Sequence, residues 1–327
     1  MTMVLPQVGL PGGVPPPAER RATGAKVKFA LRYFIQLLRT HPAYAAGYII
    51  ITVVAVVAAT APLIAPFSPI TADPSVYLQP PSLSHLFGTD ATGMDVFSRV
   101  IFAPRIDLAI AMMGTLISAI IGTSIGAWVG YFQETRGIRS FLSNVVMRAA
   151  DVLQAFPVFV FAIALVAVFG QSISSVVFAI AFVNIPIYLR LMRSQVLSIR
   201  RMRYVEAAYV CGMSDLFIIR RHIVPNAMAP VLAQLSVNIG WAVLLTAGLS
   251  FVGAGVRAPA PEWGSMIAMG FPNVMTGQWW PSVFPGLALA LTVYGFALIG
   301  ASIEFMADPR RRRTLANVRV PFATTGE

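Results

Sequence analysis

The chain has 327 residues, of which 57% are hydrophobic and 11% charged, and its formal net charge is +11. This composition is too apolar for a soluble domain and predicts an integral membrane protein with several spans. The basic residues fall in the gaps between apolar runs, so the positive charge indicates orientation in a lipid bilayer and argues against a nucleic-acid partner.

The N-terminal segment divides into two parts. Residues 1–25 are rich in proline and glycine and cannot bury a core, so we expect a disordered cytoplasmic tail. In residues 26–43 apolar side chains recur at helical spacing among basic ones, which predicts an amphipathic helix on the inner membrane surface. The apolar run that follows is too long for a cleavable signal peptide and is expected to remain as an anchor.

Further along the chain, six apolar runs are long enough to cross a bilayer, which takes about 20 helical residues. They must be helices, because lipid offers no partner for an open backbone and the alternation of a β-barrel is missing. We therefore predict an all-α integral membrane protein with a transmembrane domain over residues 44–303. The six predicted spans are residues 44–66, 106–131, 145–169, 173–191, 227–252 and 283–303.

The distribution of lysine and arginine predicts the orientation of these spans. With the N-terminus inside, 21 of the 24 basic residues lie on the cytoplasmic side, and only Arg99, Arg105 and Arg257 lie outside. The positive-inside rule then places both termini in the cytoplasm, together with a large loop over residues 192–226 and a basic tail over residues 304–327. The predicted location is the cell (inner or plasma) membrane, crossed several times.

The loop over residues 192–226 has the pattern of a compact helical hairpin. A short helix is expected over residues 200–211, with small side chains that let another protein approach closely. A glycine can end it with a positive φ, a serine can cap the next helix, and a proline is expected to stop the helix before the fifth span. These residues are Ala207, Ala208, Gly212, Ser214 and Pro225. The alternative is an ordinary basic loop held to anionic lipid.

The order of residues in this loop resembles the cytoplasmic EAA loop of ABC importer permeases. Other motifs follow in that family's order: residues 85–90 with 93–99, then 151–157, 220–226, 261–264, 284–286 and 308–310. The resemblance covers about residues 28–313 and is strongest for the second (C-type) permease of dipeptide, oligopeptide and nickel importers. The chain departs from the general EAA pattern at His222 and Val224, and the histidine there is similar to the peptide-importer variant. It departs from the peptide-importer pattern at Met94 and Ala254.

This resemblance implies a type I ABC importer permease fold and a function in ATP-driven import of dipeptides or oligopeptides, with nickel or another small solute as the alternative cargo. It implies four kinds of partner: a second permease subunit, two ATPase domains (separate or fused), an extracytoplasmic substrate-binding lipoprotein and the lipid bilayer. ATP and Mg would be bound by the ATPase partners and no cofactor by this chain. The residues implied in ATPase coupling are Glu206, Ala207, Ala208, Gly212, Met213, Ser214 and Pro225.

Two further groups of polar residues are candidate sites. Gln234 and Asn238, one turn apart in the fifth span, are candidates for lining the translocation path, although hydrogen bonds between helices are the simpler explanation. On the outer side, two segments are candidates for contact with the binding protein, and Asp95 and Arg99 are spaced to pair. A solvated helix end and anchoring at the membrane interface are the competing explanations. The outer candidates are Asp90, Asp95, Arg99, Glu262 and Trp263.

Motifs for several functions are missing from the sequence. There is no phosphate-binding G-x-x-x-x-G-K-[ST] loop, so this chain is not the ATPase, and we assign it no catalytic residue. The three histidines are far apart, which predicts that no metal is bound. No charged residue lies in mid-span, which argues against an ion-coupled secondary transporter. The sequence still leaves open a channel or an ion-coupled carrier, and also a scaffold or an intramembrane enzyme.

Overall fold

The computed structural model describes residues 34–135 and 137–307, which fall into two compact units, residues 1–45 and 46–327. In the smaller unit, residues 34–40 are helical. The predicted disordered tail and most of the predicted basic tail lie outside the described residues, as do residues 26–33 of the predicted interfacial helix.

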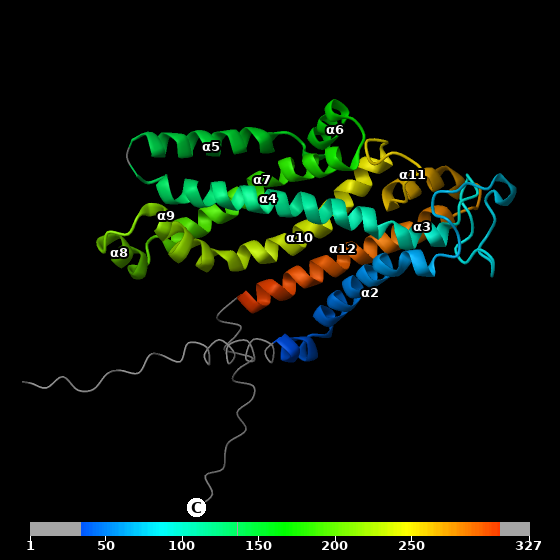
Figure 1. The fold of residues 1–327 in the computed structure, drawn as a ribbon, viewed down its shortest axis with the longest axis horizontal. Helices are drawn as coiled ribbons and strands as arrows, with labels where there is room; N and C mark the ends of the chain where they lie inside the picture. Colours follow the sequence, from blue (N-terminus) through cyan, green and yellow to red (C-terminus); the bar gives the residue numbers. More distant parts are fainter. Residues whose placement is uncertain (1–33, 136, 308–327) are drawn as a thin grey trace, which may run out of the picture. The chain divides into compact units, whose positions relative to one another are not determined.

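The described part of the chain is helical, which confirms the predicted all-α class. The α-helices, the 3-10 helix η1 and the π-helical turn η2 follow in the order α2 (Pro42–Ile64), η1 (Pro74–Val76), α3 (Val96–Phe102), α4 (Pro104–Phe132), α5 (Ile138–Ala155), α6 (Val158–Phe169), α7 (Ile173–Ile199), α8 (Arg203–Val210), α9 (Asp215–Ile218), η2 (Ile219–Ile223), α10 (Val224–Phe251), α11 (Trp263–Val274) and α12 (Trp280–Ala307). Figure 1 shows α8 and α9 at one end of the larger unit, here called the hairpin end, and α3 and α11 at the other, the cap end.

Five helical segments in the described residues are long and apolar enough to cross a membrane, and the number is six if a bent pair of helices forms one span. This agrees with the predicted six spans. The segments are α2, α3 with α4, α7, α9 with η2 and α10, and α12, and the bent pair is α5 with α6. Helix α7 continues to Ile199, so the first residues of the predicted loop 192–226 belong to this helix.

The predicted span over residues 145–169 is not one straight helix. Helices α5 and α6 meet at an angle of 93°. The break lies at Phe156 and Pro157, because a proline ring disfavours helical geometry in the residue before it. Phe156 accordingly has extended backbone angles, φ −80° and ψ 139°. In Figure 1, α6 turns away from the line of α5.

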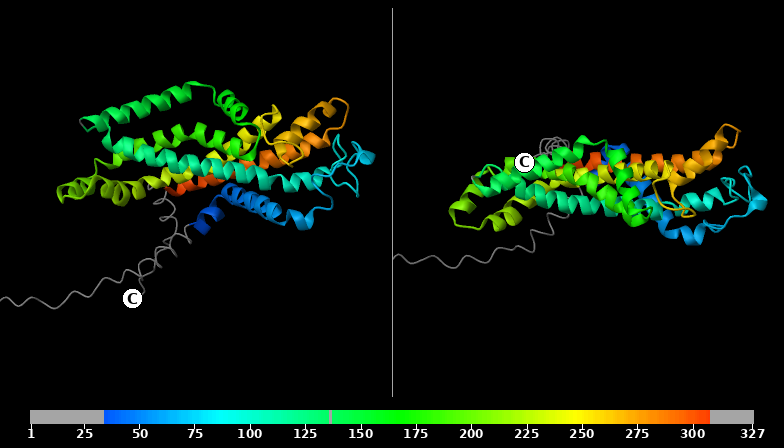
Figure 2. Two further views of the ribbon diagram at one scale, coloured as in Figure 1. Left: turned by 45° about the horizontal axis from the view of Figure 1, so that its top comes forward. Right: turned by 90° about the horizontal axis from the view of Figure 1, so that it is seen from above.

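Helices α4, α7 and α10 lie side by side, as the views in Figure 2 also show. The contact between α4 and α7 is close because glycines of α4 face α7. A Cβ atom added at Gly122 would lie 2.6 Å from the carbonyl oxygen of Ile185 and 2.7 Å from Cβ of Tyr188. Small residues let helix backbones approach in this way, and dispersion between them stabilises helix pairs in lipid.

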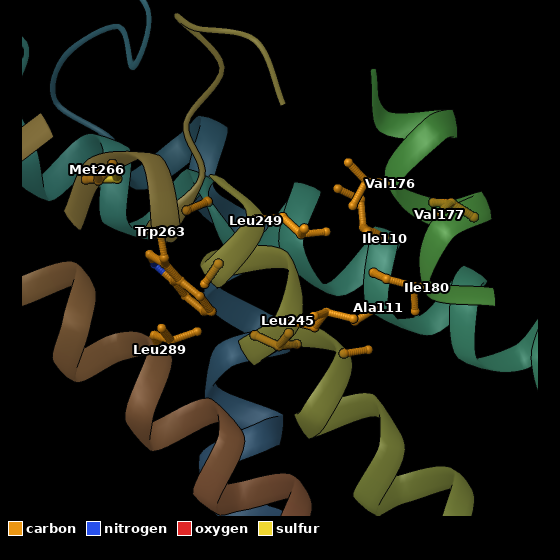
Figure 3. Close-up of a cluster of buried hydrophobic side chains, with 14 of the residues drawn as sticks. Ile110, Ala111, Val176, Val177, Ile180, Leu245, Leu249, Trp263, Met266 and Leu289 are labelled. Atoms are coloured by element: carbon orange, nitrogen blue, oxygen red, sulfur yellow. The ribbon is translucent and has the colours of Figure 1, made fainter. Parts of the chain in front are cut away.

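Two clusters of buried apolar side chains hold the helices together. Figure 3 shows the cluster nearer the cap end, where Trp263 lies beside Leu245 and Leu289 and side chains of α4 and α7 continue the cluster. The second cluster lies nearer the hairpin end and joins α4, α7 and α10 to α8 and α9. Its fully buried members include Met192, Val196, Ile218 and Ile223.

The close contact of α4 with α7 predicts that Gly122→Ala destabilises the protein. The added methyl group meets backbone, which cannot rotate away, so we expect a loss of about 1–3 kcal/mol, as for other overpacked sites. Thermal unfolding of the purified full chain, followed by circular dichroism, measures the change. Gly286→Ala in α12 is the control, because its Cβ meets nothing within 4 Å. An equal loss in both variants would contradict the explanation.

Candidate functional site

The candidate site is the hairpin formed by α8 and α9. Gly212 ends α8 with a φ of +74°, a conformation that glycine adopts without strain. The amide of Gly212 donates to the carbonyl of Tyr209 at 2.9 Å, and the amide of Met213 donates to that of Ala208 at 3.2 Å. These bonds fold the chain back on itself, so α9 begins immediately after the turn.

The segment after the turn is longer than a membrane span. From Asp215 to Phe251 it is continuously helical over 37 residues. At about 1.5 Å per residue this is roughly 55 Å, whereas the hydrocarbon core of a bilayer is about 30 Å thick. The segment is therefore longer than one crossing requires, so part of it projects beyond the membrane.

Pro225 does not end this segment, contrary to the expectation from the sequence. The helix widens into the π-helical turn η2 just before the proline, where the amide of Val224 donates to the carbonyl of Ile219. Pro225 lies in the first turn of α10, where a missing amide hydrogen is tolerated. Ser214 occupies the N-cap position of α9 but makes no capping hydrogen bond with its side chain.

The hairpin has a buried base and an exposed apolar tip. Val205 and Ala208 of α8 are buried in the cluster shared with α7 and α10. Glu206 and Ala207 are exposed, as are Gly212, Met213, Ser214 and Pro225 among the predicted coupling residues. Large exposed apolar side chains lie beside them, namely Tyr209 (68%), Val210 (80%), Met213 (40%), Leu216 (62%) and Phe217 (49%). A concentration of exposed apolar side chains is typical of a surface that binds protein or membrane.

Ion pairs and hydrogen bonds join the hairpin to the turn between α4 and α5. Asp215 accepts from the Tyr131 hydroxyl at 2.9 Å and from Arg139 at 3.0 Å. Glu134 pairs with Arg201 at 2.9 Å and lies 3.8 Å from Arg200. We call these six residues the polar clamp. None of them was predicted from the sequence, although opposite charges in two loops on the same predicted side of the membrane could have indicated them.

A cleft of about 690 Å³ lies between the clamp and α8. Its walls come from both sides: Tyr131, Phe132, Thr135, Ile138 and Arg139 from the end of α4 and the beginning of α5, and Arg200, Arg201, Val205, Glu206, Tyr209 and Asp215 from the hairpin and the residues before it. The exposed Glu206 therefore borders both the cleft and the outer surface of the hairpin.

The clamp predicts energetic coupling between Arg139 and Asp215. Both side chains are well exposed, so the pair contributes only about 0.5 kcal/mol, roughly twofold in a local opening equilibrium. We expect Arg139→Gln and Asp215→Asn each to speed amide hydrogen exchange in the hairpin, and the double variant to exchange no faster than either. The control is Arg139→Gln with Asp151→Asn, because Asp151 pairs with Arg190 and Arg148 instead. If the effects of Arg139→Gln and Asp215→Asn on the exchange rate are fully additive in the double variant, the two residues are not coupled and the explanation is wrong.

At the cap end, the predicted contacts with a binding protein are buried. Asp90, Asp95, Arg99, Glu262 and Trp263 are 9%, 3%, 1%, 0% and 1% exposed. Buried side chains offer no surface to another protein, so the structure argues against direct contact, and for Trp263 also against anchoring at the membrane interface. Their contacts within the chain explain the burial.

The predicted pair between Asp95 and Arg99 is wrong. Asp95 instead accepts from the backbone amide of Ser98 at 2.8 Å, which caps α3, and lies 2.9 Å from Nδ1 of His85. Arg99 turns to the other side, where it donates to the carbonyl of Pro69 at 2.8 Å and lies 3.8 Å from Asp90. Spacing in a helix allowed the pair, but the helix N-terminus competes for the same carboxylate.

Glu262 caps α11 beside a second acid. Its carboxylate accepts from the amides of Gly264 at 2.9 Å and Ser265 at 2.8 Å. The amide of Trp263 donates to Asp107 of α4 at 3.2 Å, so the side chain of Asp107 adjoins that of Glu262. Burial raises the pKa of Glu262. The two acids join α4 to α11 and close the cap end.

The raised pKa of Glu262 predicts that stability depends on pH. A carboxyl whose pKa is higher in the folded state stabilises that state at low pH, and this contribution is lost as the pH rises through the folded-state pKa. In Asp107→Asn the new amide can donate to Glu262 and so favours its ionised form. We therefore expect the melting temperature of this variant, relative to the unsubstituted protein, to rise from about pH 5 to about pH 8. A constant difference over this range would contradict the prediction.

The structure does not place Asn238 on an open path. Asn238 is 4% exposed and lies where α4, α7 and α10 meet, and Gln234 is half-buried and donates to its side-chain oxygen at 2.7 Å. Within the described residues, no group of three or more His, Cys, Asp and Glu side chains is arranged to hold a metal ion. The expected lack of a metal stays a prediction.

Comparison with known proteins shows the family. A model of the family described as "Binding-protein-dependent transport system inner membrane component" matches residues 122–313, more than half of the chain and including the hairpin. The chain belongs to this family. The resemblance to ABC importer permeases is thereby confirmed, and the protein is a multi-pass membrane component of a transporter, whose ATPase is a separate subunit.

Three relatives are similar over most of their length. The chain is 37% identical to the dipeptide transport system permease protein DppC of Alkalihalophilus pseudofirmus, over 81% of this chain and 85% of the relative. It is 36% identical to the probable D,D-dipeptide transport system permease protein DdpC of Escherichia coli K12, over 91% and 95%. It is 34% identical to the glutathione transport system permease protein GsiD of Pectobacterium atrosepticum, over 85% and 90%.

Proposed function

We propose that this permease is one of the membrane-spanning subunits of an ATP-driven importer of dipeptides or oligopeptides. The three relatives are named for a dipeptide, a D,D-dipeptide and glutathione, each of which contains amino-acid units joined by amide bonds. These names favour a short peptide over nickel as the cargo. No bond in the cargo is made or broken by this chain, which provides part of the passage.

The proposed assembly contains a second permease subunit, two ATPase domains and an extracytoplasmic substrate-binding lipoprotein, in the cell membrane. The ATPase domains would bind ATP and Mg, and this chain would bind no cofactor. The excess of lysine and arginine supports a cytoplasmic position for the hairpin end, because 7 basic residues lie between Arg190 and Arg221. An ATPase in the cytoplasm could then reach the hairpin.

The observation that carries the proposal is an exposed apolar tip on a hairpin whose base is buried in the helix bundle. The tip offers Tyr209, Val210, Met213, Leu216 and Phe217 to a partner. The base is buried against α7 and α10, and the polar clamp joins it to α4 and α5. A partner that displaced the tip would therefore move four of the long helices together, which is what coupling of ATP hydrolysis to alternating access requires.

The proposal predicts that Gly212→Val uncouples the transporter. The substitution adds no clash, because nothing lies within 4 Å of its Cβ, but a β-branched residue is strained at a φ of +74°. We expect insertion and assembly to persist, while uptake in proteoliposomes driven by ATP falls at least about tenfold, equivalent to roughly 1.4 kcal/mol in the activation free energy of transport. Glu206→Lys, which reverses an exposed charge beside the tip, should act in the same direction.

Gly277→Val is the matched control. Gly277 also has a positive φ, +93°, and its Cβ also has open space, but it follows α11 at the cap end. Normal uptake rates for both Gly212→Val and Glu206→Lys would contradict the proposed role of the hairpin in coupling. Uptake by this subunit alone, without nucleotide, would favour an ion-coupled carrier.

A further inference from the structure

A group of polar side chains is enclosed where α4, α7 and α10 meet, and none of them belongs to the hairpin or to the segments of the cap end. Asn184 and Tyr188 lie one turn apart on α7, Asn238 lies on α10, and Thr115 and Ser118 lie on α4. Asn238 is 4% exposed and the other four are fully buried. Their helices are all long enough to cross a membrane, so this polar group lies within the bundle of spans.

Some of these groups are hydrogen-bonded within the chain. The Ser118 hydroxyl donates to the carbonyl of Thr115 at 2.8 Å, and the Thr115 hydroxyl reaches the carbonyl of Asn238 at 3.5 Å. The side-chain oxygen of Asn238 accepts from Gln234 at 2.7 Å. These bonds provide partners for the hydroxyls of Thr115 and Ser118 and for the side-chain oxygen of Asn238. None of them involves a residue of α7.

Four polar atoms of this group have no hydrogen-bond partner within the described part of the chain: Nδ2 and Oδ1 of Asn184, the hydroxyl of Tyr188 and Nδ2 of Asn238. The Tyr188 hydroxyl lies near the side chain of Asn238 without a hydrogen bond of proper geometry. Burying polar atoms with no partner costs free energy, and three such side chains in one contact between helices call for a bound partner.

The mixture of donors and acceptors identifies the chemistry of that partner. Two amide nitrogens can only donate, Oδ1 of Asn184 can only accept, and the phenol can do both. A cation would leave the N–H groups unpaired, and an anion would leave Oδ1 unpaired. Water satisfies both. Pro186 lies between Asn184 and Tyr188 in α7 and has no backbone N–H. The carbonyl of Phe182, four residues earlier, therefore lacks its usual helical donor and is a further acceptor.

We propose that this polar group is a water-binding site, in which about one or two buried water molecules bridge Asn184 and Tyr188 of α7 to Asn238 of α10. Water can exchange one partner for another without leaving a polar atom bare. The site is therefore a hydrated part of an otherwise apolar contact, at which α7 and α10 can shift relative to each other. This inference does not depend on the identity of the cargo.

Radiolytic hydroxyl-radical labelling tests for the water directly, because radicals formed from a buried water molecule modify the side chain beside it. The full chain, purified from membranes with its bound subunits, is exposed to a pulsed X-ray beam, and modified peptides are measured by mass spectrometry. We expect Tyr188 to be labelled at least several-fold faster than Trp263. Trp263 is the control because it is 1% exposed, its Nε1 donates to the carbonyl of Val100, and an indole is no less reactive than a phenol. Equal protection of both residues would overturn the proposal.

Asn184→Leu gives a second test, in which a dry site and a hydrated site predict opposite signs. In a dry site the substitution removes two unpaired polar atoms at similar volume, so the melting temperature rises. In a hydrated site it removes partners of the bound water, so the melting temperature falls, by roughly 2–4 °C, and labelling of Tyr188 drops to the level of Trp263. A rise in melting temperature would overturn the proposal. If the variant does not fold, the comparison of Tyr188 with Trp263 in the unsubstituted protein still decides the question.

Discussion

The close contact between α4 and α7 is the constraint on which the rest of this fold depends. Glycines of α4, of which Gly122 is one, let the two backbones approach until an added methyl group would meet a carbonyl oxygen. In lipid, tight packing has to replace the hydrophobic effect as the force that holds helices together. Helix α10 then packs on both helices, and α12 packs on α10. The hairpin and the cap end are built on this framework.

The two ends of the bundle use polar groups in different ways. At the cap end, Arg99, Asp107 and Glu262 are buried and fix loops against helices. At the hairpin end, Glu134, Arg139 and Asp215 are exposed to water, where each ion pair contributes little. Burial makes the cap end rigid, whereas weak, solvated pairs let the clamp open and reform. This difference fits the proposed role of the hairpin end in coupling.

Much of the fold could be predicted from the sequence, because apolar length reports membrane spans directly. Gly212 was predicted to end a helix and does so, since few other residues adopt its positive φ. The break at Phe156 and Pro157 was not predicted, because the length of an apolar run does not show whether the helix changes direction within it. Pro225 was read as a helix stop, but a π-helical turn accommodates it. The partners of Asp95 and Arg99 depend on segments distant in sequence, which spacing within one helix cannot reveal.

The right-angled break between α5 and α6 has a consequence for the surroundings of this chain. The last carbonyl groups of one helix and the first amide groups of the next have no partner inside either helix. Acyl chains cannot provide one, so irregular backbone at membrane depth persists only where protein or water shields it. The side of the molecule that carries Phe156 and Pro157 therefore cannot be left facing bare lipid. Its natural neighbour is a companion subunit or an aqueous vestibule.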